Sequence, residues 1–165
     1  MRAYLAGPDV FLKNAQAVGL RKKQMCAERG ISGHYPLDND LPPQAMPIYR
    51  ANVSLIQSCD LVIANLTPFR GPSADPGTVF EVGYAAALGK AVWGYSADGR
   101  DYLARVTPDA YGIEDFGWPE NLMIPGAIQQ SGGQIIRGPS LGPIDDLAAF
   151  AAFAACLDAI RASGR

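Results

Sequence analysis

The run Leu61-Val62-Ile63-Ala64-Asn65-Leu66 constrains the fold more than any other segment of the chain. It is continuous, β-branched and almost wholly apolar, whereas a strand with one face in water alternates apolar and polar side chains. Such a run is typical of a strand that is buried on both faces, as in a parallel sheet covered by helices. The sequence therefore predicts a mostly parallel sheet with helices packed on each side.

Other short apolar runs alternate with segments of helical spacing, which is the order expected of βαβ units. Strands are predicted at residues 3–6, near 34–35, at 61–66, at 91–95 and near 135–136, and helices at 11–29, 45–58, 78–88 and 144–162. Residues 36–43 have the composition of a polar turn, and 96–125 are predicted to be irregular. This order predicts a flavodoxin-like, doubly wound α/β sandwich with a mostly parallel sheet of about five strands.

Composition limits the classes of partner. At 165 residues, with 48% hydrophobic and 18% charged residues, the chain is predicted to fold as one globular domain over residues 1–165. Its 14 Lys and Arg are scattered and the formal net charge is −2, so a nucleic-acid polymer is disfavoured as a partner. The one basic cluster, Arg21-Lys22-Lys23, is predicted to be the solvated face of a helix.

Cysteine usage and hydropathy indicate the compartment. The three cysteines, Cys26, Cys59 and Cys156, are odd in number and widely spaced, which is typical of a reducing environment. Gly7-Pro8 interrupts the first residues before a signal-like apolar run develops, and no stretch approaches the roughly 20 apolar residues of a membrane span. A cytoplasmic protein without a membrane anchor is expected.

Ligands of open α/β sheets bind outside the carboxyl ends of the strands, where the strand order reverses. That rule selects three loops here, at residues 7–11, 37–43 and 67–77. Glu81 follows the third loop near the start of a predicted helix, where its side chain can face the cleft and the helix amino terminus favours its ionised form. An ionised carboxylate there suits a nucleophile, but an acidic residue that only complements the helix dipole has the same position.

Asp75 and Tyr4 are predicted to converge on Glu81, because Asp75 precedes the helix by a Pro-Gly bend and Tyr4 lies on the adjacent first strand. Glycosidic chemistry needs two carboxyl groups in different environments. One stays ionised to attack or stabilise an oxocarbenium-like carbon, and the other donates a proton to the leaving group. A phenol beside the nucleophile can orient it. Taken alone, Asp75 fits an N-cap or an Asx-turn better than a catalytic acid.

Two further polar groups have competing interpretations. Asn52 lies near the middle of a predicted helix, where a polar side chain usually faces solvent. Asp38-Asn39-Asp40 has the composition of a turn, yet the same groups at a ligand-bearing edge could match the hydrogen bonds of a base. His34, the single histidine, falls on a predicted strand, so a Ser-His-Asp relay has no clear base. Phosphate-loop, dinucleotide and metal-ligand motifs are missing from the sequence, and no cofactor or metal is expected.

Five segments, in order over roughly the first three-quarters of the chain, resemble the nucleoside 2-deoxyribosyltransferase family. They are Tyr4-Leu5-Ala6-Gly7-Pro8, Tyr35-Pro36-Leu37-Asp38-Asn39, Cys59 to Leu66, Asp75 to Ala85 and Asn121-Leu122-Met123. The Glu-x-Gly-Tyr-Ala helix with its upstream Asp is the most specific of these. The resemblance implies a transferase of nucleotide salvage that acts on a 2′-deoxynucleoside and a free nucleobase.

The resemblance also implies a mechanism, in which Glu81 attacks C1′, forms a covalent deoxyribosyl-enzyme and releases the base. A second base then reverses the step, with retention at C1′. Asp75 would protonate or hold the base, Tyr4 would position Glu81, and Asn121 would come from a neighbouring subunit of a homo-oligomer with shared active sites. The predicted substrate-binding residues are Asn52, Asn121, Asp40, Gly7, Asp9, Phe11 and Met123.

Departures from the family pattern leave other functions open. Asn52 stands where some members have Asp, which puts its role in base binding in doubt, and Arg165 is not assigned the sugar contact that a terminal carboxylate makes in some members. A 2′-deoxynucleoside 5′-phosphate N-hydrolase and a nucleoside-binding module without turnover are the alternatives. Asp9 is expected to repel a 5′-phosphate, which favours a nucleoside, although Arg70 could supply a phosphate contact from another loop.

Overall fold

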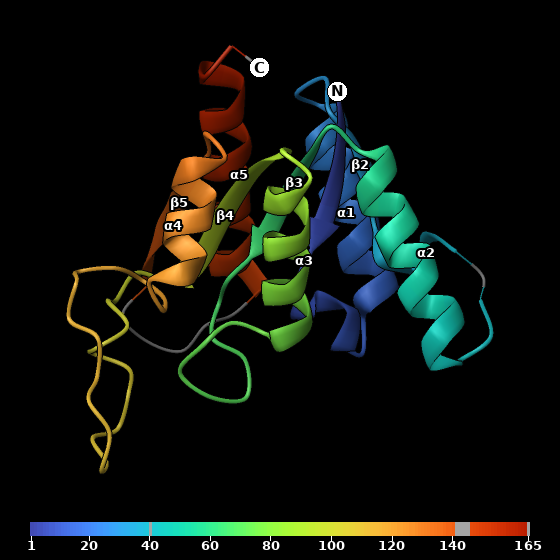
Figure 1. Ribbon diagram of the computed structural model, residues 1–165. Helices are drawn as coiled ribbons and strands as arrows, with labels where there is room; N and C mark the ends of the chain where they lie inside the picture. The colour runs from blue at the N-terminus through green and yellow to red at the C-terminus, as the bar shows by residue number, and fades with distance from the viewer. Residues whose placement is uncertain (40, 141–145, 165) are drawn as a thin grey trace.

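Five parallel strands form the centre of the computed structural model, which describes residues 1–39, 41–140 and 146–164 (Figure 1). The strands are β1 (Arg2–Ala6), β2 (Ser32–His34), β3 (Leu61–Asn65), β4 (Ala91–Asp98) and β5 (Ile135–Ser140), in the order β2-β1-β3-β4-β5. Each neighbouring pair runs parallel. This is the flavodoxin-like order, so the predicted fold class is confirmed.

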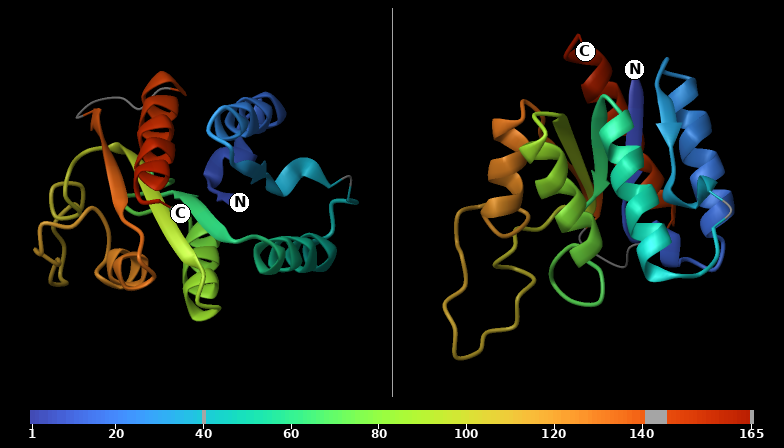
Figure 2. Two further views of the ribbon diagram at one scale, coloured as in Figure 1. Left: turned by 90° about the horizontal axis from the view of Figure 1, so that it is seen from above. Right: turned by 45° about the vertical axis from the view of Figure 1, so that its right-hand side comes forward.

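Helices cover both faces of the sheet, as the fully buried strand at 61–65 requires. α1 (Ala15–Ala27) and α5 (Asp146–Ala162) pack on one face, and α2 (Ala45–Ser58), α3 (Pro76–Ala87) and α4 (Met123–Gln130) pack on the other (Figure 2). Short 3₁₀ helices at Pro8–Phe11 and Pro36–Asp38 follow β1 and β2. No helix among the described residues is long and apolar enough to cross a membrane.

Side-chain alternation along β1 separates the two cores. Ala3 and Leu5 belong to the cluster beneath α1 and α5, whereas Tyr4 and Ala6 belong to the cluster beneath α2, α3 and α4. Successive side chains of a strand point to opposite faces, so Tyr4 necessarily lies on the α3 side of the sheet. This register brings its ring toward the helix that carries Glu81.

Several predicted boundaries differ from the observed ones. The helix predicted from residue 11 begins at Ala15, because Pro8–Phe11 forms a separate 3₁₀ turn. The helix predicted from residue 78 begins at Pro76, since Asp75 caps it and proline suits the first helical position. The segment predicted to be irregular contains the end of β4 and the start of α4. The predicted start of the last helix, at residue 144, lies outside the described residues.

The prediction of a solvated basic face is wrong for Lys22. Its side chain is only 3% exposed, and Nζ lies 2.6 Å from Asp9 Oδ2 and donates to Tyr95 Oη at 2.6 Å. The position faces the sheet, because Val18 and Cys26, four residues before and after it, are also buried. Arg21, one position earlier, is exposed as expected.

The carboxyl ends of the strands meet at the edge of the sheet opposite the two termini (Figure 1). The loops after β1, β2 and β3 lie there, and so does a long excursion between β4 and α4. We call this excursion, residues 99–122, the arm; it projects beyond the sheet at the same edge (Figure 1). The arm is closed on itself by a hydrogen bond from Tyr102 N to Trp118 O of 2.8 Å.

Candidate active site

Tyr4 and Glu81 form the centre of the candidate site. Tyr4 Oη donates a hydrogen bond to Glu81 Oε1 at 2.5 Å, between the middle of β1 and the second turn of α3. Burial raises the pKa of the Tyr4 phenol, and the neighbouring Glu81 raises it further. The phenol therefore stays protonated and acts only as a donor to Glu81 at neutral pH.

The Glu81 carboxyl titrates near neutrality. Burial raises its pKa to about 7, the hydrogen bond from Tyr4 opposes this rise, and the charge of Asp75 adds to it. The expectation that the helix amino terminus favours the ionised form is not met. α3 begins at Pro76, which leaves Glu81 beyond the first turn where the dipole acts. The interpretation of Glu81 as a dipole-complementing residue is excluded for the same reason.

Asp75 has two functions in the fold and at the site. As the N-cap of α3, its Oδ2 accepts hydrogen bonds from Thr78 N at 2.9 Å and from Thr78 Oγ1 at 3.1 Å. The capping interpretation of Asp75 is thus correct. The same side chain also lines a cavity together with Glu81, so the cap orients a carboxyl group beside the centre of the site. A capped aspartate is held in one rotamer at no further entropic cost.

A cavity of about 130 Å³ lies above Glu81, and five predicted site residues line it: Gly7, Phe11, Asn52, Asp75 and Glu81. The remaining lining residues, which sequence reasoning missed, are Val10, Pro36, Gly77 and Thr78. Val10 and Gly77 lie inside loops that the switch-point rule selects, so naming every residue of those loops would have found them. Pro36 and Thr78 lie one residue outside the selected loops. Asn52 is half-buried and faces the cavity from α2, contrary to the solvent-facing alternative.

Glycine is required at residue 7 because the first loop closely approaches the end of β3. A Cβ atom at this position would lie 2.6 Å from Asp9 Oδ2 and 2.7 Å from Asn65 Cβ, which is closer than real atoms come. The first loop therefore passes tightly over the ends of β1 and β3. That passage places the backbone of residue 7 against the Glu81 cavity.

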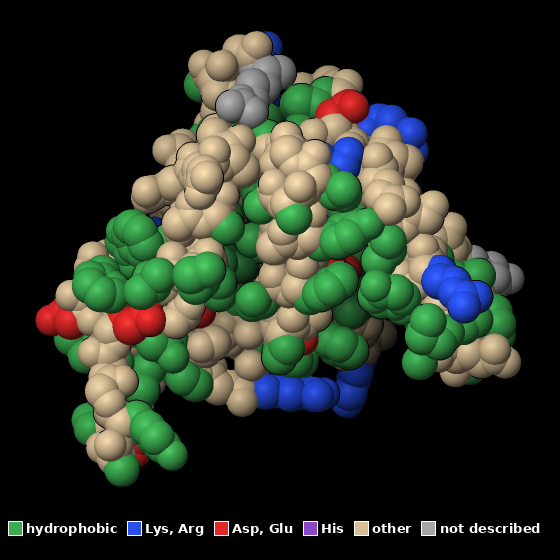
Figure 3. Space-filling model, viewed as in Figure 1, with side chains coloured by type: hydrophobic (Ala, Val, Ile, Leu, Met, Phe, Trp, Pro, Cys, Tyr) green, Lys and Arg blue, Asp and Glu red, His purple; other side chains and the backbone are tan. Residues whose placement is uncertain are grey.

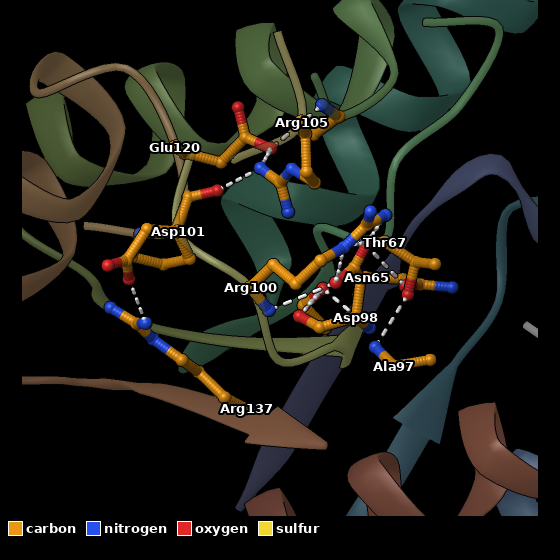
Figure 4. A network of polar contacts seen from close by, with 12 residues as sticks. Asn65, Thr67, Ala97, Asp98, Arg100, Asp101, Arg105, Glu120 and Arg137 are labelled. Atoms are coloured by element: carbon orange, nitrogen blue, oxygen red, sulfur yellow. Dashed lines mark hydrogen bonds and ion pairs between the residues drawn. The ribbon is translucent and has the colours of Figure 1, made fainter. Parts of the chain in front are cut away.

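Asp9 does not lie among the described residues that line this cavity. Its carboxylate is buried, paired with Lys22 at 2.6 Å, and accepts from Asn65 Nδ2 at 3.1 Å. The expectation that Asp9 repels a 5′-phosphate is therefore wrong, because Lys22 neutralises the carboxylate below the floor of the site. The polar chain continues through Thr67, whose N donates to Asn65 Oδ1 at 3.1 Å and whose Oγ1 accepts from Ala97 N at 3.0 Å (Figure 4).

Asn121 and Met123 do not line the Glu81 cavity of their own chain. Asn121 Nδ2 donates to Glu114 Oε1 at 2.7 Å and lines a separate hollow of about 220 Å³ formed by the arm itself. Met123, at the start of α4, is 71% exposed. Asp40 lies outside the described residues. Its neighbour Asp38 is a structural residue, since it accepts from Tyr35 N at 2.9 Å and pairs with Lys23.

A second groove adjoins the first cavity. It measures about 490 Å³, runs along residues 69–76 and shares Phe11 and Asp75 with the Glu81 cavity. Phe11 and Phe69 stack with centroids 5.4 Å apart, and the Arg70 guanidinium lies 4.8 Å from the Phe69 ring. The described residues contain no group of three His, Cys, Asp or Glu side chains that could hold a metal ion. The site thus offers carboxyl, phenol, amide and aromatic groups.

The family model of nucleoside 2-deoxyribosyltransferase matches residues 3–123. The chain belongs to this family. A solved structure, the 2-desoxiribosyltransferase of Leishmania mexicana, is 32% identical, with a TM-score of 0.68 over 93% of this chain and 97% of that one. A protein of Schizosaccharomyces pombe described as uncharacterized is 33% identical over 79% of this chain and 78% of its own length.

A more distant structure shares the fold. The CMP N-glycosidase of Clostridium botulinum is 21% identical, with a TM-score of 0.53 over 85% of this chain and 91% of that one. Membership of the family makes this chain an enzyme of the nucleoside deoxyribosyltransferase kind, with nucleosides and nucleobases as its implied substrates.

Proposed function

We propose that the enzyme exchanges the base of a 2′-deoxynucleoside through a covalent deoxyribosyl intermediate on Glu81. The observation that carries the proposal is the arrangement of Glu81, which accepts from Tyr4 at 2.5 Å and shares a cavity with Asp75. Two carboxyl groups in unlike environments are the minimum that retaining glycosidic chemistry requires. Glu81 is held by a phenol, whereas Asp75 is held by the amide and hydroxyl of Thr78.

In the first step the Glu81 carboxylate attacks C1′, and the bond between C1′ and the base nitrogen breaks. The electron pair of that bond leaves with the base, which takes a proton from Asp75. In the second step a nitrogen of the incoming base attacks C1′, the ester bond to Glu81 breaks, and the proton returns to Asp75. Two inversions give net retention, and each displacement is easier than a direct exchange.

Tyr4 supports the first step by its position. Its phenol stays protonated, so it fixes the orientation of Glu81 and lowers the pKa that burial has raised. With a pKa of about 7, a substantial fraction of Glu81 is ionised at neutral pH and can attack. Phe11, which is 58% exposed at the mouth of the cavity, offers a ring on which the base can stack.

The proposal includes a homo-oligomer with shared active sites. Asn121 and Met123 do not line the Glu81 cavity of their own chain, so the proposal assigns them to the site of a neighbouring subunit. An apolar face suited to such contact covers α2 and α3 (Figure 3), where Tyr49, Phe80 and Tyr84 form a row of aromatic contacts. Tyr49 and Phe80 are 47% and 48% exposed. A contiguous exposed aromatic surface of this kind is typical of a protein–protein contact.

A cytoplasmic role in nucleotide salvage is part of the same proposal. Cys26, Cys59 and Cys156 are free and buried, which is consistent with a reducing compartment. Nucleosides and nucleobases are the small molecules that base exchange interconverts. Phosphorylated building blocks and nucleic-acid polymers are not required for this reaction.

The test is incubation of the enzyme with deoxyinosine, with and without free adenine, followed by chromatography of all four bases and nucleosides. Deoxyadenosine formed only when adenine is present supports transfer. Hypoxanthine released at the same rate without adenine overturns transfer in favour of hydrolysis. If neither deoxyadenosine nor hypoxanthine forms, both enzymatic functions are overturned and a nucleoside-binding module remains.

Hydrolysis of a 2′-deoxynucleoside 5′-phosphate is the second candidate, and one observation favours it. The groove that shares Asp75 with the Glu81 cavity carries Arg70, and Asp9 is neutralised by Lys22. A 5′-phosphate could therefore meet a guanidinium without an opposing free carboxylate from the first loop. Deoxyinosine 5′-monophosphate used in place of deoxyinosine, without added base, tests this candidate directly.

A further inference from the structure

Arg105 and Glu120 form a buried ion pair outside the Glu81 cavity. Arg105 Nη2 lies 3.0 Å from Glu120 Oε1, and the two side chains are 2% and 0% exposed (Figure 4). Both residues belong to the arm, and Arg105 also donates to the carbonyl oxygen of Pro119. The pair therefore fixes the two halves of the arm against each other, beside the hydrogen bond from Tyr102 to Trp118.

Stability alone does not account for this pair. Burial disfavours both charges, and a pair of this kind is often no better than apolar residues of the same volume. Within the part of the chain that the structure describes, Arg105 Nε, Arg105 Nη1 and Glu120 Oε2 have no hydrogen-bond partner. Unpaired polar atoms in a buried position call for a reason other than packing.

The contact that gives a reason lies on the loop that carries Asp75. Ala74 N donates a hydrogen bond of 3.1 Å to Glu120 Oε1, and Ala74 is the residue directly before Asp75. Both Ala74 and Glu120 are buried, so water does not compete for this bond. The oxygen that accepts from Ala74 is the same one that pairs with Arg105, so one atom joins the arm to the loop.

The hydrogen bonds of Leu66 and Thr67 hold only the start of this loop. Residues 66–75 contain no helix or strand, and their internal backbone bond, from Phe69 N to Ser73 O at 2.9 Å, closes the turn ahead of Ala74. On the far side, Asp75 is fixed by the cap of α3. Glu120 thus holds the backbone amide of Ala74, directly before the N-cap residue Asp75. Without Glu120, the Asp75 carboxyl could shift relative to Glu81.

We propose that Glu120, held by Arg105, is a positioning residue that fixes the Asp75 carboxyl for proton transfer to the leaving base. The inference rests on the proposed role of Asp75. Glu120 touches no reacting atom and acts through the peptide of Ala74. Its removal should therefore slow donors whose leaving base needs a proton more than donors whose leaving base needs none.

The experiment compares two donors that differ in their need for an acid. Deoxyinosine leaves well only when the base is protonated, whereas 7-methyl-2′-deoxyguanosine already carries the positive charge and needs no proton. Glu120→Ala should lower kcat with deoxyinosine by at least about tenfold and kcat with the methylated donor by less than about threefold, since a general acid contributes roughly 10²–10⁴. Asp75→Ala should show the same difference between the two donors, with a larger loss of kcat for deoxyinosine.

Matched variants separate positioning from folding. Glu120→Gln keeps an oxygen that can accept from Ala74 N, so it should restore most of the deoxyinosine rate. Glu120→Asp keeps the charge but is one methylene shorter and should reproduce the split even where Glu120→Ala does not fold. Asp101→Asn removes the partly exposed ion pair, 2.5 Å long, between Asp101 on the arm and Arg137 on β5, and should change neither rate (Figure 4).

An equal loss with both donors in Glu120→Asp and Glu120→Ala, alongside a split in Asp75→Ala, would overturn the proposal. A second measurement does not depend on turnover. Exchange of the Ala74 amide hydrogen should be slow in the wild type and in Glu120→Gln and at least about tenfold faster in Glu120→Ala. If the wild type turns over neither donor, the proposed function fails, and an unprotected Ala74 amide would remove the positioning contact as well.

Discussion

Tyr4 and Glu81 are separated by 77 positions in the chain and joined by a hydrogen bond of 2.5 Å. The strand register decides this contact, because Tyr4 is the residue of β1 that points toward α3 while its neighbours Ala3 and Leu5 point away. The bond is the main influence that opposes the rise in the pKa of Glu81. It therefore connects a feature of the sheet to the ionisation of the proposed nucleophile.

Tyr4→Phe should leave the fold intact and shift the acidic limb of the pH profile. Without the donor, the pKa of Glu81 rises above about 7, so less of it is ionised at neutral pH. A hydrogen bond to a charged group is worth about 1.5–3 kcal/mol, so the limb should move up by about one to two pH units and kcat/KM at pH 7 should fall by roughly five- to fiftyfold. Initial rates between pH 5 and 9 measure the limb. An unchanged limb would contradict the assigned contact.

Glu81→Gln should abolish turnover and stabilise the fold at neutral pH. The folded-state pKa of about 7 lies above the ordinary value of 4.5, so the native state binds its proton more tightly than the unfolded state does. This stabilisation is complete below pH 4.5 and is lost as the pH rises through 7. The neutral amide of the Glu81→Gln variant does not lose this stabilisation. The free energy of unfolding of Glu81→Gln at pH 8 should therefore exceed that of the wild type by on the order of 1–3 kcal/mol.

Thermal unfolding of the wild type and Glu81→Gln at pH 5 and pH 8 measures the difference. A gain of this size corresponds to a rise in Tm of roughly 2–10 °C at pH 8 for a chain of this length, and the gain should shrink at pH 5. Glu28→Gln is the control, since Glu28 is an exposed carboxylate on the other face of the sheet. A gain that is equal at both pH values would show that desolvation of Glu81 is not its cause.

Lys22→Met should destabilise the protein strongly, because it leaves the buried carboxylate of Asp9 without its partner at 2.6 Å. Removal of one partner of a buried pair costs about 3–5 kcal/mol. The double variant Lys22→Met with Asp9→Asn should recover much of this loss. Denaturant unfolding of the four proteins of this cycle gives the coupling energy. If the losses of the two single variants simply add in the double variant, Lys22 and Asp9 do not interact.

Mixed subunits should recover activity that neither parent has. Glu81→Ala lacks the nucleophile and Asn121→Ala lacks the proposed sugar contact, so each assembly alone should be inactive or nearly so. After subunit exchange, about one quarter of the shared sites contain both wild-type residues if pairing is random. Base exchange should return to roughly that fraction. Activity that stays at the level of the parents would place Asn121 outside the neighbouring site.

Local patterns predicted most of the fold. The helix at 45–58 has the predicted bounds, and the strand at 61–65 is one residue shorter than predicted, because apolar spacing within each segment determines both. The arm at 99–122 could not be predicted, since its shape depends on pairs such as Arg105 with Glu120 that have no periodicity. Lys22 was misassigned because its partner, Asp9, lies in a separate loop.

The candidate site divides in the same way. Topology predicted that the loops with Gly7, Asp75 and Glu81 meet, because the ends of parallel strands share one edge of the sheet. The ionisation of Glu81 was not predictable, since burial by neighbouring helices outweighs its position in α3. The contact between Glu120 and Ala74 spans 46 positions and leaves no mark in the sequence.

Glu120 and Asn121 are successive residues of the arm, but their proposed roles concern two different subunits. Glu120 touches the acid-bearing loop of its own subunit, whereas Asn121 is proposed to meet the sugar bound by the next one. In a closed symmetric assembly such links join each site to its neighbour without a break. Sugar binding at one site should then alter proton donation at another, so the saturation curves of the wild type and Glu120→Ala should differ in steepness.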